Sequence, residues 1–126
     1  MAYNSFETLI DIINSFPEMP EEIITNGGVQ ISETDGRKES LAIAQVGSQI
    51  SEYLCGDKLV DLEYKIIYQK ATQTNEEKLE CLRFMGELFD WIMNSSTLVR
   101  PKNSPQLFNK NNNGLDRFEM SMYCWG

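Results

Sequence analysis

The chain has 126 residues and a mass of 14.5 kDa, which is enough for one compact hydrophobic core. With 41% hydrophobic and 24% charged residues, its composition is that of a globular protein rather than a disordered or fibrous one. Its 19 acidic and 11 basic residues give a net charge of -8, which excludes a basic coat that grips nucleic-acid phosphates.

The first predicted element is an amphipathic helix over residues 4–16. Asn4 can cap its start, and Pro17 and Pro20 end it. Its apolar residues recur at steps of three and four and form one stripe: Phe6, Leu9, Ile10, Ile13 and Phe16. The connection that follows, up to Gly28, is expected to include a short helical turn over residues 21–25.

From Val29 onward the apolar period changes to two, which predicts strands over about 29–33, 40–46, 49–54 and 59–70. Asp35 and Gly36 predict a hairpin-type turn between the first two strands. The last of these strands has one apolar face, formed by Val60, Leu62, Tyr64, Ile66 and Tyr68. Ile67 breaks the alternation, since it is an apolar residue on the opposite face, which is expected to contact water. An antiparallel meander is expected.

A second helix is predicted over residues 75–94, because Thr74 with Glu77 three residues later forms a capping box. Phe84, Leu88 and Trp91 widen its apolar stripe beyond what packing on one sheet face requires. Two explanations stay open, namely core filling and a partner subunit that covers part of the helix.

The end of the chain is predicted to hold a flexible loop over residues 101–114 and a strand over residues 116–125. Pro101, Pro105 and an Asn-rich run interrupt the first segment, whereas Phe118, Met120 and Met122 alternate with polar residues in the second. The whole chain, residues 1–126, is therefore expected to form a single α+β domain. It contains a small, mostly antiparallel sheet of four or five strands packed with two main helices.

The negative charge is concentrated at the start of the chain. The first 36 residues contain seven acids and neither Lys nor Arg. One interpretation is a solvated face that keeps a small protein in solution. The other is a negative surface turned towards passing DNA or a basic partner.

The sequence offers little for catalysis. It contains no His, which removes the commonest general base and metal ligand, and no glycine pattern of a phosphate-binding loop. Cys55, Cys81 and Cys124 form no CxxC pair and are expected to be reduced thiols of an intracellular protein. We expect no enzymatic activity, no metal and no cofactor. No segment predicts a secretory signal or a membrane helix.

Three segments together resemble the small minor capsid or tail terminator proteins (head–tail joining, neck) of long-tailed bacteriophages. They are the strand from Leu59 to Tyr68, the helix that opens at Asn75-Glu76-Glu77 and runs to Ile92, and the closing strand from Phe118 to Tyr123. The resemblance implies an α/β sandwich without an active site. It also implies a hexameric ring that caps the tail tube, joins it to the head connector and lets DNA pass through its lumen without specific binding.

The first hypothesis is therefore a virion structural protein of the tail or neck, assembled in the host cytoplasm, whose partners are its own copies, the tail tube protein and the head–tail connector protein. Aromatic and strand-edge groups are the candidate intersubunit contacts: Asp35, Gly36, Ile67, Trp91, Phe118, Met120, Tyr123 and Trp125. The alternative is a small acidic cytoplasmic inhibitor or DNA mimic that occupies a basic site on another protein.

Overall fold

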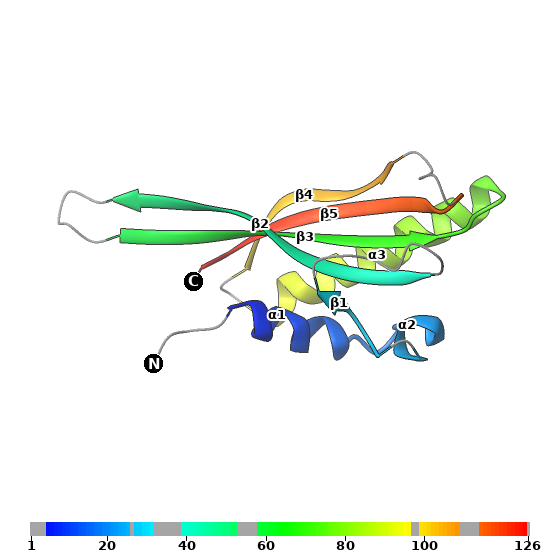
Figure 1. Cartoon of the computed structure of the whole chain (residues 1–126), viewed down its shortest axis with the longest axis horizontal. Coiled ribbons are helices and arrows are strands. Elements are labelled where there is room, and N and C mark those ends of the chain that lie inside the picture. Colours follow the sequence, from blue (N-terminus) through cyan, green and yellow to red (C-terminus); the bar gives the residue numbers. More distant parts are fainter. Residues whose placement is uncertain are drawn as a thin grey trace.

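The computed structural model describes residues 5–25, 27–31, 39–52, 58–96, 99–108 and 114–125. Its strands form one five-stranded sheet in the order β1-β2-β3-β5-β4, on which the helices pack (Figure 1). The α+β class predicted from the sequence is confirmed. The elements in chain order are α1 (Ser5–Asn14), α2 (Glu21–Thr25), β1 (Gln30–Ile31), β2 (Ser40–Glu52), β3 (Lys58–Lys70), α3 (Asn75–Ser95), β4 (Val99–Phe108) and β5 (Asp116–Trp125).

The sheet is mixed rather than mostly antiparallel, because β1 runs parallel to β2. The prediction that the first two strands form an antiparallel hairpin is therefore wrong. The turn before β1 explains this direction. Gly27 and Gly28 have φ values of 92° and 87°, which favour glycine, and they turn the chain after α2. The amide of Val29 then donates a hydrogen bond of 3.0 Å to the Asn14 side chain at the end of α1. A Cβ at position 28 would lie 2.5 Å from the same Asn14 oxygen, so this close approach also requires glycine.

Strand β2 is one continuous strand of 13 residues, so the prediction of two strands over 40–46 and 49–54 is wrong. A β-bulge explains the error. Gln45 pairs with Tyr64 and Gly47 with Glu63, so Val46 is an extra residue in the ladder. A bulge reverses the alternation of side chains without ending the strand, and in the sequence this change of phase resembles a break between two strands.

Residues 101–108 are also a strand, so the flexible loop predicted over 101–114 is wrong for this part; residues 109–113 lie outside the described residues. Pro101 and Pro105 are tolerated because β4 is an edge strand that pairs with β5 on one side. The ladder shifts register between Pro101 and Asn103, and again between Asn103 and Gln106. The prolines therefore mark an irregular edge strand and not a loop.

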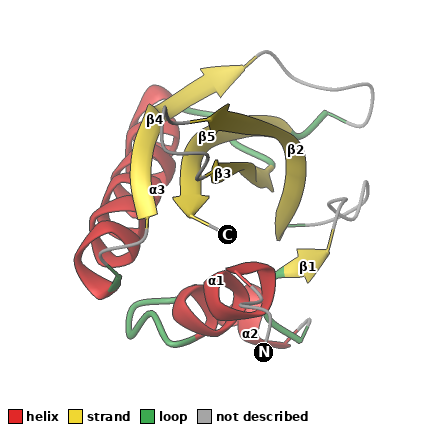
Figure 2. Ribbon diagram, turned by 90° about the vertical axis from the view of Figure 1, so that its left-hand side faces the viewer, coloured by secondary structure: helices red, strands yellow, loops and turns green. Residues whose placement is uncertain are grey.

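The core lies between the sheet and the helices. Figure 2 shows the strands as a curved sheet, with α1 and α2 below its open side and α3 alongside β4. From the helices come Leu9, Ile13, Cys81, Met85, Leu88 and Ile92, and the sheet contributes Leu41, Ile43, Tyr64, Ile66, Tyr68, Phe118, Met120, Met122 and Cys124. The predicted apolar face of β3 is thus buried at Tyr64, Ile66 and Tyr68.

Helix boundaries follow local capping chemistry. Thr74 caps α3, and its hydroxyl accepts a hydrogen bond of 3.2 Å from the amide of Glu77. The Glu77 carboxylate in turn accepts one of 2.8 Å from the amide of Gln73, so the predicted capping residues do interact with the helix start. The short helix predicted over 21–25 is also present as α2. Helix α1 ends at Asn14, two residues earlier than predicted.

Candidate functional site

The hairpin of β2 and β3 extends beyond the body of the protein (Figure 1). Strand β3 pairs with β5 from Lys70–Asp116 only as far as Asp61–Trp125, whereas its pairing with β2 continues to Lys58–Glu52. The end of this hairpin is thus a two-stranded ribbon, which is marginally stable in water without further contacts. We call residues 50–52 and 58–60, which pair with each other beyond the end of β5, the hairpin arm.

The two edges of the sheet differ. On the β2 edge, β1 pairs only with Ala42 and Ile43, so within the described part of the chain residues 44–52 have a strand on one side alone. The β4 edge is guarded along most of its length by Pro101, Pro105, two register shifts and basic side chains. Such features protect natural sheets from edge-to-edge association.

Exposed apolar side chains lie at both edges. Val46 on β2 is 46% exposed, and Leu107 and Phe108 at the end of β4 are 40% and 43% exposed. These residues were not among the sequence-based candidates. The one signal that pointed to the first of them is the small residue Gly47 next to Val46, which is typical of a bulge.

Charge is segregated between the layers. Within 5–25 and 75–95 the chain has ten acids and two bases: Glu7, Asp11, Glu18, Glu21, Glu22, Glu76, Glu77, Glu80, Glu87 and Asp90 against Lys78 and Arg83. Within 39–52, 58–70, 99–108 and 116–125 it has six of each: Glu39, Glu52, Asp61, Glu63, Asp116 and Glu119 against Lys58, Lys65, Lys70, Arg100, Lys102 and Arg117. The helical layer therefore has a strong negative charge and the sheet is balanced.

Two carboxylates of the helical layer come into contact. The pKa of Glu87 on α3 is raised mainly because its protonated carboxyl donates a hydrogen bond to Glu18, in the segment between α1 and α2. The nearby negative charge of Glu18 acts in the same direction on Glu87. This pair is a local sign of the negative potential on the helical face.

The sheet face opposite the helices has a network of paired charges. The Arg100 and Lys102 cations lie 5.5 and 5.6 Å from the centre of the Tyr123 ring. Lys102 also forms an ion pair of 2.7 Å with Glu63, and this hydrogen bond raises the pKa of Lys102. Tyr123 is thus partly covered by two basic side chains of the edge strand.

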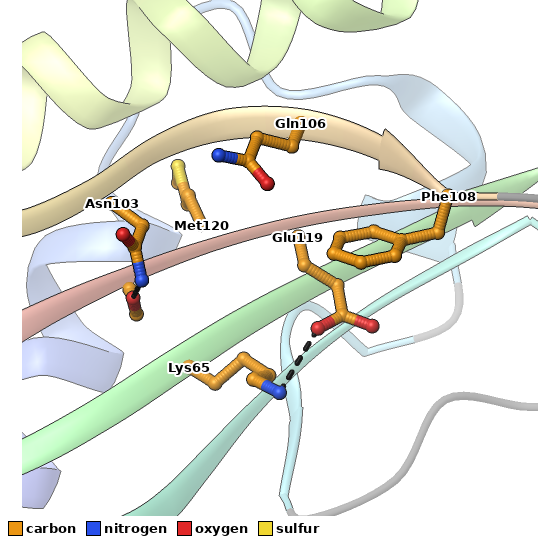
Figure 3. A pocket seen from close by; sticks show the side chains of 7 residues that line it. Lys65, Asn103, Gln106, Phe108, Glu119 and Met120 are labelled. Atoms are coloured by element: carbon orange, nitrogen blue, oxygen red, sulfur yellow. Dashed lines mark hydrogen bonds and ion pairs between the residues drawn. The ribbon is translucent and has the colours of Figure 1, made fainter.

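A hollow lies on the same face between β3, β5 and the end of β4. Figure 3 shows Lys65 directed towards Glu119, at 3.0 Å, with Phe108 beside them. Asn103 donates a hydrogen bond of 2.9 Å to the Ser121 hydroxyl. Because these polar groups satisfy one another, a ligand in the hollow would have to displace existing bonds. The hollow does not point to a substrate.

A polar cluster lies where β3 ends and α3 begins. The buried Tyr68 donates a hydrogen bond of 2.8 Å to Glu39, and burial together with this carboxylate raises the pKa of Tyr68 far above its usual range. Burial likewise raises the pKa of the Cys81 thiol to about 11. Both groups therefore stay protonated near neutral pH, which is the opposite of an activated nucleophile or base.

The interface residues predicted from the sequence differ in how exposed they are in the structure. Phe118 and Met120 are 0% and 1% exposed, because they lie on the face of β5 that packs in the core and β5 lies between β3 and β4. Ile67 is 6% exposed rather than on a wet face. It lies opposite Ala42 and Glu119 in register, on the face where Lys65 and Glu119 form an ion pair. The apolar stems of such long charged side chains cover apolar neighbours. These three residues have no surface left for a partner.

The other candidates retain some accessibility or lie outside the description. Tyr123 is half-buried under the two basic side chains. Trp125 ends β5, where its backbone pairs with Asp61, and its side chain is not among those described. Asp35 and Gly36 lie outside the described residues.

Trp91 links the two main helices. Its Nε1 donates a hydrogen bond of 2.9 Å to the carbonyl oxygen of Ile12, and its ring lies 6.0 Å from that of Phe16. Of the two explanations for the wide apolar stripe of α3, the described contacts of Trp91 favour packing within the subunit.

We expect Trp91→Phe to lower the free energy of unfolding by about 0.5–1.5 kcal/mol, because the hydrogen bond that joins α3 to the Ile12 carbonyl is lost while most of the ring packing is kept. The loss stays small because this carbonyl still accepts a hydrogen bond of 2.7 Å from the Ser15 hydroxyl. Hydrogen exchange in α1 should speed up, whereas Leu79→Ala on the exposed face of α3 should leave it unchanged. Equal exchange rates in the two variants would contradict a link through Trp91.

Among the described residues there is no group of three or more potential ligands that could hold a metal ion. None of the described helices combines the length and the apolar character that crossing a membrane requires. No known family model matches the chain, and no curated protein is detectably similar to it in sequence.

Proposed function

We propose that the protein is a virion structural protein, a tail terminator or neck subunit that acts by assembly into a hexameric ring and not by catalysis. In this role the ring caps the tail tube, meets the head connector on its other side and allows DNA to pass. The sequence resemblance to tail terminator proteins supports the proposal.

The observation that carries the proposal is the hairpin arm. A two-stranded ribbon that extends beyond the sheet gains little stability from the subunit that bears it. Contacts with a neighbour would stabilise it. A subunit with an arm on one side and different groups on the other is suited to head-to-tail contacts, which close into rings when the rotation allows.

The charge distribution fits the same role. A helical layer with ten acids and two bases repels DNA phosphates, so a ring that turns this layer towards its lumen would let DNA slide.

Native mass spectrometry of the purified protein, alone and mixed with isolated tail tubes, tests the proposal. We expect masses at multiples of six subunits, and rings at one end of the tube in electron micrographs. A protein that stays monomeric both alone and with tubes would overturn it.

The charge segregation also favours a second candidate, a small acidic inhibitor or DNA mimic that acts through its helical face. Salt separates the two functions. Binding of such an inhibitor to a basic protein should weaken steeply between about 50 and 500 mM salt and give a one-to-one complex, whereas assembly through strands and apolar contacts should persist.

A further inference from the structure

We infer that the open edge of β2, residues 44–52, is where a second copy of this chain adds its β4, so that the sheet continues from one subunit to the next. This inference rests on the proposed function, since it assigns the contact that forms the ring.

The β2 edge is suited to strand addition. Residues 47–51 contain no proline and no charge, and they pair regularly with β3 on their other side. The backbone N–H and C=O groups that alternate towards the free side are therefore a template for another strand. Within the described part of the chain, the one irregularity of β2 on this edge is the bulge at Val46, which comes before the regular stretch begins.

The end of β4 in a second copy of the chain is suited to pair with this β2 edge. Its last three residues, Gln106–Phe108, pair regularly with β5 and follow the second proline. Leu107 and Phe108 there are exposed, as is Val46 on the opposite edge, so joining the edges brings apolar side chains out of water on both sides.

Charge supports the choice of these edges over the helical layer. Two helical layers with ten acids each would repel one another. Strand β4 has two bases and no acid, and β2 has no charge from Ala44 to Ser51. Because the two edges of one sheet are different surfaces, their contact is heterologous, which is the type that generates rings.

The first test places a lysine on the β2 edge. Lysine is the residue with which natural sheets block edge pairing, and Val46→Lys at this 46% exposed position should raise the concentration needed for half-maximal assembly at least tenfold. Leu79→Lys is the matched control, since it makes the same change at a 61% exposed apolar residue on α3. It should assemble like the unmodified protein. Equal assembly of both variants would overturn the inference.

The second test uses cross-linking and does not depend on how well Val46→Lys folds. Val46→Cys and Leu107→Cys subunits are prepared separately, each with Cys55→Ser, so that the introduced thiol is the one that reacts. Cys81 and Cys124 are kept because they are buried. They are then treated with a short bis-maleimide. We expect cross-linked dimers only when the two kinds of subunit are mixed. Dimers from Val46→Cys subunits alone would mean that β2 pairs with β2, and no dimers in the mixture would mean that these edges do not meet.

The two proposals fail in different ways. Six-fold rings that form in both lysine variants and give no mixed cross-link would leave the ring function standing and reject the strand addition. Mixed cross-links in open fibres that never close into rings or bind tube ends would reject the tail terminator function and keep the edge contact.

Discussion

Phe118→Ala should lower the free energy of unfolding by about 3–5 kcal/mol, among the largest effects of any single substitution in this chain. Phe118 is 0% exposed, its ring lies 6.0 Å from that of Tyr68, and it sits between Tyr68 on β3 and Leu107 on β4 in register. Removing the ring leaves a cavity that neighbouring strands, held by backbone hydrogen bonds, cannot close. Urea unfolding followed by circular dichroism measures the loss.

Phe108→Ala is the matched control for this experiment. It removes the same ring from the same sheet at a position that is 43% exposed, so we expect a loss below about 1 kcal/mol in the dissociated subunit. Together the two variants separate a core aromatic residue from an edge aromatic residue. A loss at Phe118 as small as that at Phe108 would contradict the placement of β5 inside the sheet.

The second large effect is a loss of stability at alkaline pH that depends on Cys81. The Cys81 side chain is 3% exposed, and burial raises its pKa from 9.0 to about 11. Between these values the unfolded chain releases the thiol proton while the folded protein keeps it. The unfolded state then binds fewer protons, so the free energy of unfolding falls as pH rises, by about 3 kcal/mol over the two units. Tyr68 acts in the same direction above pH 10.

Cys81→Ala isolates the thiol contribution. At pH 8 the variant should be less stable than the unmodified protein by its packing loss alone. Towards pH 11 the difference should shrink by about 3 kcal/mol and change sign, because the variant has no thiol to ionise. Unfolding curves of both proteins at pH 8, 9, 10 and 11 provide the comparison. A difference that stays constant over this range would show that burial of the thiol does not control its ionisation.

The structure changes which residues are candidates for intersubunit contacts, from aromatic residues within strands to exposed residues at the strand edges. In a sequence, an aromatic residue in an alternating strand looks the same whether its strand is central or at an edge. Phe118 and Met120 are in the core because they lie on the core face of β5, which also has a neighbouring strand on each side. Val46 and Phe108 are exposed because their strands lie at or next to the sheet margins.

The sequence by itself determined the elements whose signals are local. The 3.6-residue period with a capping box predicted α3, and the two-residue period predicted β3 and β5. The composition gave the net charge of -8. These features depend on neighbouring residues along the chain, so no long-range contact was needed to recognise them.

The tertiary structure alone decided strand order, the continuity of β2 and the strand character of β4. Each depends on a partner that is distant in sequence: β3 accommodates the bulge at Val46, and β5 supplies the one ladder that Pro101 and Pro105 can tolerate. It also decided that Ile67, which by alternation faces water, is covered by the side chains of adjacent strands. Pairing between segments that are distant in sequence decides which positions are buried, and a local sequence pattern does not indicate which segments pair.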